Sequence, residues 1–211
     1  MLVDSHCHLN FPDFKDDLAS IIARAKEAGV GVMQTICTEM EEFDEIYAIS
    51  EKYPGVFCSV GVHPNDSAKQ EIVIAQELID KTSRGRVIGI GETGLDYYYE
   101  YSDKRLQIDS FLEHIKAARE TGLPLIIHTR DAEDDTINIL KDEIAKGLFK
   151  FLIHCFTSTK ELADISVKLG GYISVSGIIT FKNAQDIRDA LLDVPLNRLL
   201  IETDSPFLAP V

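Results

Sequence analysis

The chain has 211 residues, of which 45% are hydrophobic, so it can form a single domain, residues 1–211, with a substantial buried core. Its 35 acidic residues outnumber its 21 basic residues, and the net charge of −14 excludes long-range attraction to nucleic acid. A phosphate-bearing substrate would have to be held locally, by a bound cation or by a few basic side chains.

Short runs rich in valine, isoleucine and leucine alternate with amphipathic segments along the chain. The first run, residues 2–9, is followed by a helical pattern over residues 13–29 that ends at Gly29. Further strands are predicted at 30–37, 56–64, 87–96, 123–130, 151–156, 171–177 and 199–206, with helices at 72–82 and 103–122. Nearly continuous apolar strands separated by helices indicate a parallel sheet covered by helices.

Eight such strands predict an α/β fold, the (β/α)8 TIM barrel. The alternative is an open doubly wound sheet, although the chain has no GxGxxG or P-loop motif. The sequence stops at Val211, seven residues after Asp204, so we expect the barrel to lack its final C-terminal helix. We expect this to leave an apolar face on the first and eighth strands, through which two copies of the chain could form a homo-oligomer.

The remaining bulk features indicate the compartment. The four cysteines, at positions 7, 37, 58 and 155, show no paired spacing and are typical of reduced thiols. No charged and apolar leader precedes Val3, and no apolar run approaches membrane-spanning length. We therefore expect a cytoplasmic protein with no membrane partner.

Histidines and carboxylates lie at the carboxyl ends of most predicted strands. His6 and His8 flank Cys7, so both imidazoles point to one face of the first strand and can share a divalent cation. In a parallel barrel the strand ends converge on one rim, which carries the active site. Each residue alone could instead be a buried core histidine or a helix cap, and His114, inside a helix, is expected to be an ordinary helix-face residue. The other strand-end residues are His63, Glu92, His128, His154 and Asp204.

Several motifs run from residue 4 to residue 210, namely DSHCHL, GVHP, GETGLDYYY, the Gln107–Phe111–His114 helix, IIHTRDA, IHCFT, SVSGIITFK and ETDSPFLAP. With these motifs the chain resembles the TatD family of metal-dependent hydrolases, which are described as deoxyribonucleases with an amidohydrolase-like barrel. It departs from the family at Asn10, where Asp is frequent, and at its end, where the family continues into a last helix.

The resemblance implies two divalent metal ions as cofactors. It implies that His6, His8 and Asp204 bind one ion, that His128 and His154 bind the other, and that Glu92 bridges them. Imidazole and carboxylate donors suit Zn²⁺ or Mn²⁺, and Mg²⁺ is less natural at imidazole. Asp204 is the expected proton acceptor, so Asp204 and Glu92 are the candidate catalytic residues.

Two carboxylates are expected behind these ligands. Glu202 shares a strand face with Asp204 and is expected to fix a ligand histidine. Asp4 has the same relation to His6, with a charge at the lower end of the barrel as the alternative.

Three residues are candidates for substrate binding. His63 is expected to contact a phosphate or a leaving group, and a buried core histidine is the alternative. Arg130 shares a face with His128 and could clamp a phosphate. Lys182 follows the seventh strand and could reach the same rim; ordinary solvation is the alternative for both basic residues. The tyrosines at positions 97–99 offer a platform on which bases could stack.

These features predict a hydrolase of ester bonds, a two-metal phosphodiester hydrolase that acts as a deoxyribonuclease on single-stranded or frayed DNA ends. Release of nucleotides from a 3′ end is implied by the resemblance alone. One alternative is a hydrolase of a small ester, lactone or amide, because the same site can attack a carbonyl. The other is a metal-binding protein that is inactive because its last helix is missing.

Overall fold

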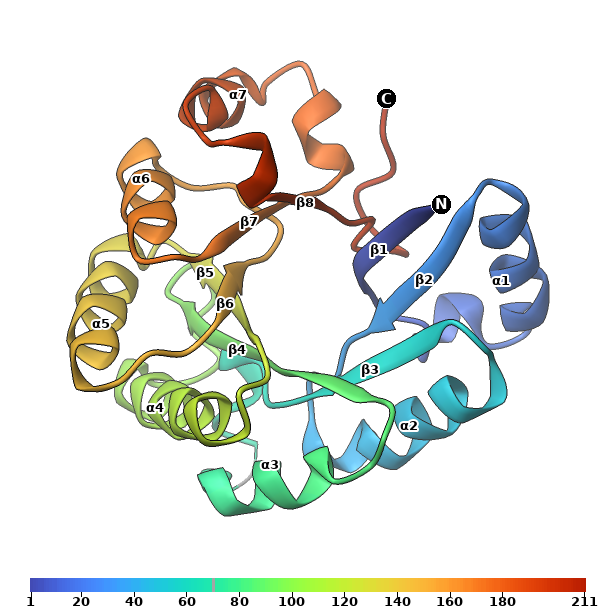
Figure 1. Ribbon diagram of the computed structural model, residues 1–211, viewed down its shortest axis with the longest axis horizontal. Coiled ribbons are helices and arrows are strands. Elements are labelled where there is room, and N and C mark those ends of the chain that lie inside the picture. The colour runs from blue at the N-terminus through green and yellow to red at the C-terminus, as the bar shows by residue number, and fades with distance from the viewer. Residues whose placement is uncertain (70) are drawn as a thin grey trace.

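The computed structural model of the protein describes residues 1–69 and 71–211. Within these residues, eight parallel strands follow one another around a ring in the order of the sequence (Figure 1). Each predicted run contains one strand, and the barrel is confirmed; the open doubly wound sheet is wrong, because the strand order never reverses. The strands are β1 (Leu2–Cys7), β2 (Val30–Thr35), β3 (Val56–Val60), β4 (Val87–Asp96), β5 (Leu125–Arg130), β6 (Phe151–Ile153), β7 (Tyr172–Val175) and β8 (Leu199–Ile201).

The ring closes where β1 meets the segment that follows β8. Cys7 forms an isolated parallel bridge with Ser205. The backbone N–H of His8 donates to the carbonyl of Ser205 at 2.8 Å, and that of Asp204 donates to the carbonyl of His6 at 2.9 Å. This seam places His6, His8 and Asp204 side by side, although they come from opposite ends of the sequence.

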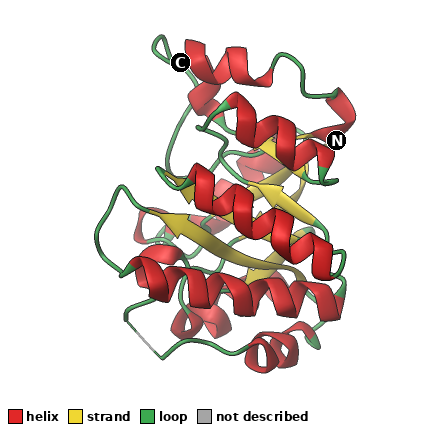
Figure 2. Cartoon of the chain, turned by 90° about the vertical axis from the view of Figure 1, so that its left-hand side faces the viewer, coloured by secondary structure: helices red, strands yellow, loops and turns green. Residues whose placement is uncertain are grey.

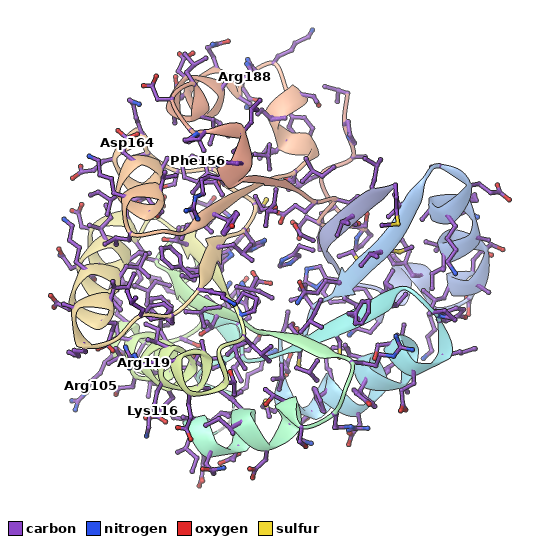
Figure 3. The ribbon with its side chains drawn as sticks, viewed as in Figure 1. Arg105, Lys116, Arg119, Phe156, Asp164 and Arg188 are labelled. Carbon is purple, nitrogen blue, oxygen red and sulfur yellow. The ribbon has the colours of Figure 1, made fainter. Side chains whose placement is uncertain are left out.

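Helices between successive strands cover the outside of the ring (Figures 1 and 2). The longest, α4, starts after Asp103, whose carboxylate accepts the backbone N–H of Arg105 at 2.8 Å, and ends at Gly122, whose φ of 72° favours glycine. In Figure 3 the charged side chains of Arg105 and Lys116 extend from α4 to the outside of the molecule. The described chain has α1 (Leu18–Glu27), α2 (Phe43–Lys52), α3 (Ala75–Thr82), α4 (Lys104–Thr121), α5 (Glu133–Lys146), α6 (Lys160–Lys168) and α7 (Gln185–Leu191).

Apolar side chains fill both the space under the helices and the interior of the ring. Phe111 and Ile115 of α4 are fully buried and belong to the large cluster between helices and strands. Ile36, Ile126 and Leu152 form a separate cluster. Ile126 of β5 and Leu152 of β6 are paired neighbours, whereas Ile36 follows β2, so the three side chains meet across the interior of the barrel. This packing leaves the rim as the place for a polar site.

Residues 202–211 follow β8 and contain no helix in the described chain. Val3 and Ile201 are 46% and 55% exposed, so apolar side chains of β1 and β8 are open to solvent. In the part of the chain that the structure describes, no helix is both long and apolar enough to cross a membrane.

Candidate metal centre

A cavity of about 1270 Å³ opens at the carboxyl ends of the strands. Polar side chains from the ends of six strands face it or lie directly beside it. His6 is fully buried next to this group. The strand-end residues that line the cavity are His8, His63, Glu92, His128, His154 and Asp204.

The first group of ligand atoms lies at the barrel seam. The Nε2 atoms of His6 and His8 are 3.3 Å apart. Oδ1 of Asp204 lies 3.5 Å from Nε2 of His6 and 3.4 Å from Nε2 of His8. Burial alone would raise the pKa of Asp204, but its hydrogen bond to His8 and the charges of nearby histidines outweigh burial and lower that pKa. An ionised carboxylate and two imidazoles therefore converge on one point.

Glu92 lies between this group and the remaining histidines. Its Oε2 is 3.3 Å from Nε2 of His6. Its Oε1 is 2.7 Å from Nε2 of His154 and 3.3 Å from Nδ1 of His128. Burial by itself would raise the pKa of Glu92, but the surrounding imidazoles, His154 first, hold it well below its usual range. Glu92 is therefore a carboxylate whose two oxygens face two different sets of nitrogen atoms.

The backbone around Glu92 brings β4 close to β5. The pairing of β4 with β5 changes register between Ile90 and Thr93, the segment that contains Glu92. Gly91 has a φ of 133°, and a Cβ there would lie 2.6 Å from the carbonyl oxygen of Ile126. Only glycine permits this approach without a shift of the neighbouring strand.

The donor set fits divalent metal ions. Three groups of the described residues have ligand atoms within 4.8 Å of one another, namely His6–His8–Glu92, His63–Glu92–His128 and His6–His154–Glu202. Imidazole nitrogens and carboxylate oxygens face each other with no basic side chain between them in the contacts described, which is the arrangement that a metal ion would stabilise.

Asp96 is a functional candidate that the sequence analysis missed. Its Oδ2 accepts a hydrogen bond from Nε2 of His128 at 2.9 Å, which leaves Nδ1 of that ring facing Glu92. Its Oδ1 accepts the backbone N–H groups of Tyr98 and Tyr99, each at 3.0 Å. The alternation of β4 was the available signal, because Glu92 and Asp96 are four residues apart and share a face.

Two other carboxylates lie behind the ligands. Oε1 of Glu202 accepts the backbone N–H of Cys155 at 2.6 Å and lies 3.5 Å from Nδ1 of His154. Asp4 is also buried: its Oδ1 accepts the N–H of Thr203 at 2.9 Å, and its Oδ2 accepts the hydroxyl of Thr203 at 2.7 Å. Asp4 thus ties β1 to the segment that carries Asp204.

The predicted substrate contacts lie in different places. Nε2 of His63 is 3.5 Å from Oε1 of Glu92, and burial lowers the pKa of His63 to about 3, so this ring is neutral. Arg130 lines the cavity, and its guanidinium stacks on the ring of Tyr98 at 3.7 Å. Lys182 is exposed and does not belong to the described residues that line the cavity.

The tyrosines also differ from expectation. The hydroxyl of Tyr97 donates to Asp135 at 2.7 Å, and Tyr97 lies outside the lining described for the cavity. Tyr99 and Tyr101 line the cavity instead, with ring centroids 5.3 Å apart and an interplanar angle of 4°. A stacking surface therefore exists, but it starts at Tyr99 and includes Tyr101, which the sequence analysis did not select.

His114 has a more specific place than an ordinary helix-face residue. It is fully buried in α4, and its Nε2 accepts the backbone N–H of Val62 at 3.0 Å. Its Nδ1 lies 2.7 Å from the carbonyl oxygen of Ser110. His114 thus holds the chain next to His63 against α4.

Comparisons with known proteins agree with this geometry. A sequence model of the family described as "TatD related DNase" matches residues 3–211. The chain is 42% identical to the uncharacterized metal-dependent hydrolase YcfH of Escherichia coli, with 100% of this chain and 79% of that protein covered. It is 37% identical to the uncharacterized metal-dependent hydrolase YabD of Bacillus subtilis, of which it covers 82%. The crystal structure of the TatD homologue YjjV from Escherichia coli superposes with a TM-score of 0.90 at 32% identity, covering 100% of this chain and 81% of that one.

Proposed function

Because this chain belongs to the TatD-related DNase family, we propose that it hydrolyses phosphodiester bonds at DNA ends with the help of two divalent metal ions. The broader class, a metal-dependent hydrolase, follows from the family and from the cluster of histidines and carboxylates. The finer proposal is supported by one observation above all: the two oxygens of Glu92 face two separate sets of imidazole nitrogens.

In this proposal His6, His8 and Asp204 hold one ion, His128 and His154 hold the other, and Glu92 contacts both. The nitrogen and oxygen donors favour Zn²⁺ or Mn²⁺ over Mg²⁺. Bound ions of this kind supply an acidified water and offset the charge that develops on a phosphate. The ionised Glu92 carboxylate reduces the repulsion between two cations held close together.

The side chains of the protein would divide the remaining tasks. Asp204 is ionised, and we assign it the role of accepting a proton from the attacking water. Neutral His63, beside Glu92, is placed to contact the phosphate or the leaving group. Glu202 and Asp96 orient His154 and His128 from behind.

The test is a substrate panel with metal-free protein reloaded with Mn²⁺, Zn²⁺ or Mg²⁺. We expect a single-stranded oligonucleotide labelled at its 5′ end to be shortened stepwise from its 3′ end, and a simple ester or lactone to be turned over poorly. Glu92→Gln should abolish the activity, and Glu77→Gln, on the exposed surface of α3, should not change it. Preference for the ester would favour the carbonyl hydrolase, and bound metal without turnover of any substrate would favour a non-catalytic metal protein.

A further inference from the structure

The cavity carries few positive charges of its own. Lys69 is held in ion pairs with Glu39 at 2.8 Å and Asp66 at 2.7 Å, so its charge is already neutralised. The guanidinium of Arg130 instead packs against the rings of Tyr98 and Tyr99, and no ion pair with a carboxylate is found for it within the described residues. Acidic residues line the rest of the wall, namely Glu39, Glu42, Asp66, Asp131 and Glu133. Among the described residues that line the cavity, Arg130 is therefore the basic side chain that remains available to bind a phosphate.

The position of Arg130 is fixed by stacking. Its guanidinium carbon lies 3.7 Å from the ring centre of Tyr98 and 5.0 Å from that of Tyr99. Stacking on an aromatic face leaves the N–H groups at the guanidinium edge free to donate in the plane. Arg130 ends β5 two residues after His128, so its donors lie beside the ligand cluster.

Beside this arginine lies the stacked pair of Tyr99 and Tyr101, whose rings partly cover each other, so that a base can stack on an outer face of the pair. Their rings are stacked nearly parallel, line the cavity, and are 38% and 69% exposed. Asp96 fixes the start of this loop by accepting the N–H groups of Tyr98 and Tyr99. Because acidic residues surround the cavity, additional phosphates would be repelled, so recognition of a nucleotide beyond one phosphate has to come from uncharged contacts such as stacking.

We propose that Arg130 and the Tyr99–Tyr101 surface form a subsite for one terminal nucleotide, with its phosphate on Arg130 and its unpaired base on the tyrosines. The proposal rests on the proposed function, since it names how that same site would recognise a DNA end. Every base presents a flat face, so the subsite should accept all four bases and should reject a base that is still paired within a duplex.

Small ligands separate the two halves of the subsite. Binding of thymidine 5′-monophosphate, 2-deoxyribose 5-phosphate and inorganic phosphate would be measured by NMR titration of the full chain in a buffer free of Mn²⁺. Each titration would be run with and without a diamagnetic divalent ion such as Zn²⁺. The base should add on the order of tenfold in affinity over deoxyribose phosphate. Tyr101→Ala should remove this difference and leave phosphate binding unchanged. Tyr99→Ala should also remove the difference but should weaken phosphate binding slightly, because Tyr99 packs against Arg130. Arg130→Ala should weaken all three ligands.

Tyr172→Ala is the matched control, because Tyr172 is an exposed tyrosine at the start of β7, at the other end of the barrel. The corresponding kinetic test compares oligonucleotides ending in a normal nucleotide or in an abasic residue. For the oligonucleotide with a normal end, the tyrosine variants should raise KM about tenfold, towards the KM of the oligonucleotide with an abasic end. Their kcat should change little.

Equal affinity for thymidine 5′-monophosphate and deoxyribose 5-phosphate in the unaltered protein would overturn the subsite, even if DNA is hydrolysed. The same conclusion would follow if Phe207→Ala, on the lining near Asp204, removed the base preference in place of the tyrosine variants. Base-dependent binding without any hydrolysis of DNA would keep the subsite and reject the proposed nuclease activity.

Discussion

Glu92 and Asp204 are both ionised carboxylates of the ligand cluster, but their contacts differ. Glu92 meets imidazoles on both sides, whereas in the described chain the carboxylate of Asp204 forms its ion pairs with His6 and His8. We expect Glu92→Gln to lose at least one metal ion together with the activity. Asp204→Asn should retain the ion at the other group and lose about 10²–10⁴-fold in rate, the typical value of base catalysis. Metal analysis of both purified variants beside their rates at saturating Mn²⁺ would decide, and an active Asp204→Asn would refute the assigned base.

Asp96 acts on the cluster through His128. An asparagine at this position can turn its amide nitrogen towards Nε2 of His128. The amide nitrogen cannot accept the Nε2 proton, so the ring is no longer fixed with Nδ1 towards Glu92. We expect Asp96→Asn to weaken metal binding by about 10- to 100-fold, measured by competition with a chelator. Asp135→Asn, which alters the carboxylate that accepts from Tyr97, serves as the control. Unchanged metal affinity in Asp96→Asn would show that His128 is oriented by other contacts.

The sequence predicted that the residues of the cluster lie close together because histidines and acids recur at the carboxyl ends of several predicted strands, although each alone is ambiguous. Asp96 and His114 were missed because their roles depend on which segment they meet, namely the His128 ring and the backbone at Val62. Lys182 lies outside the described lining of the cavity. Its position after the seventh strand does not determine the path of the following loop, and its contact with a substrate stays a prediction. A single sequence predicts faces and ends of elements better than contacts between distant segments.

At the scale of elements, α4 supports the segment that follows β3 through the contact of His114 with Val62. Burial lowers the pKa of His114 to about 4, below the value of about 6.5 for a free histidine. The unfolded chain therefore binds a proton more readily than the folded chain. The contribution of neutral His114 to the free energy of unfolding is complete above about pH 6.5 and is lost as the pH falls towards 4. In His114→Gln the amide oxygen can still accept from Val62 but does not titrate.

We expect the free energy of unfolding to fall less between pH 7 and pH 5 in His114→Gln than in the unaltered chain, by about 2 kcal/mol. Urea unfolding in the presence of a chelator would measure this, because the other histidines then titrate alike in both proteins. His114→Leu should cost about 1–3 kcal/mol at pH 7, since it leaves the N–H of Val62 buried without an acceptor. Parallel pH profiles of the unaltered chain and His114→Gln would contradict the assignment.

The strands were predictable because buried parallel strands are apolar throughout, and the barrel follows from their number and order. The helices after β2, β5, β6 and β7 were expected only from the alternation of strands and helical segments.

The open face of β1 and β8 leads to a prediction of its own. We expect the chain to self-associate through Val3 and Ile201, and Val3→Lys with Ile201→Lys to give a monomer in sedimentation experiments. A monomeric unaltered chain would exclude this.

At the scale of the whole molecule, the net charge of −14 opposes a polyanionic substrate. Long-range repulsion is screened by salt, with a Debye length of about 10 Å at 0.1 M, whereas the contact with one phosphate is short-ranged. We therefore expect kcat/KM for single-stranded DNA to rise or stay level as KCl is increased from about 20 to 150 mM, unlike the steep fall typical of proteins that neutralise many phosphates. The effect should be larger for a long oligonucleotide than for a trinucleotide, because the longer strand carries more charge into the field of the protein. A tenfold fall in kcat/KM over this range would mean that a basic surface binds many phosphates along the strand. That result would contradict binding of one terminal nucleotide only.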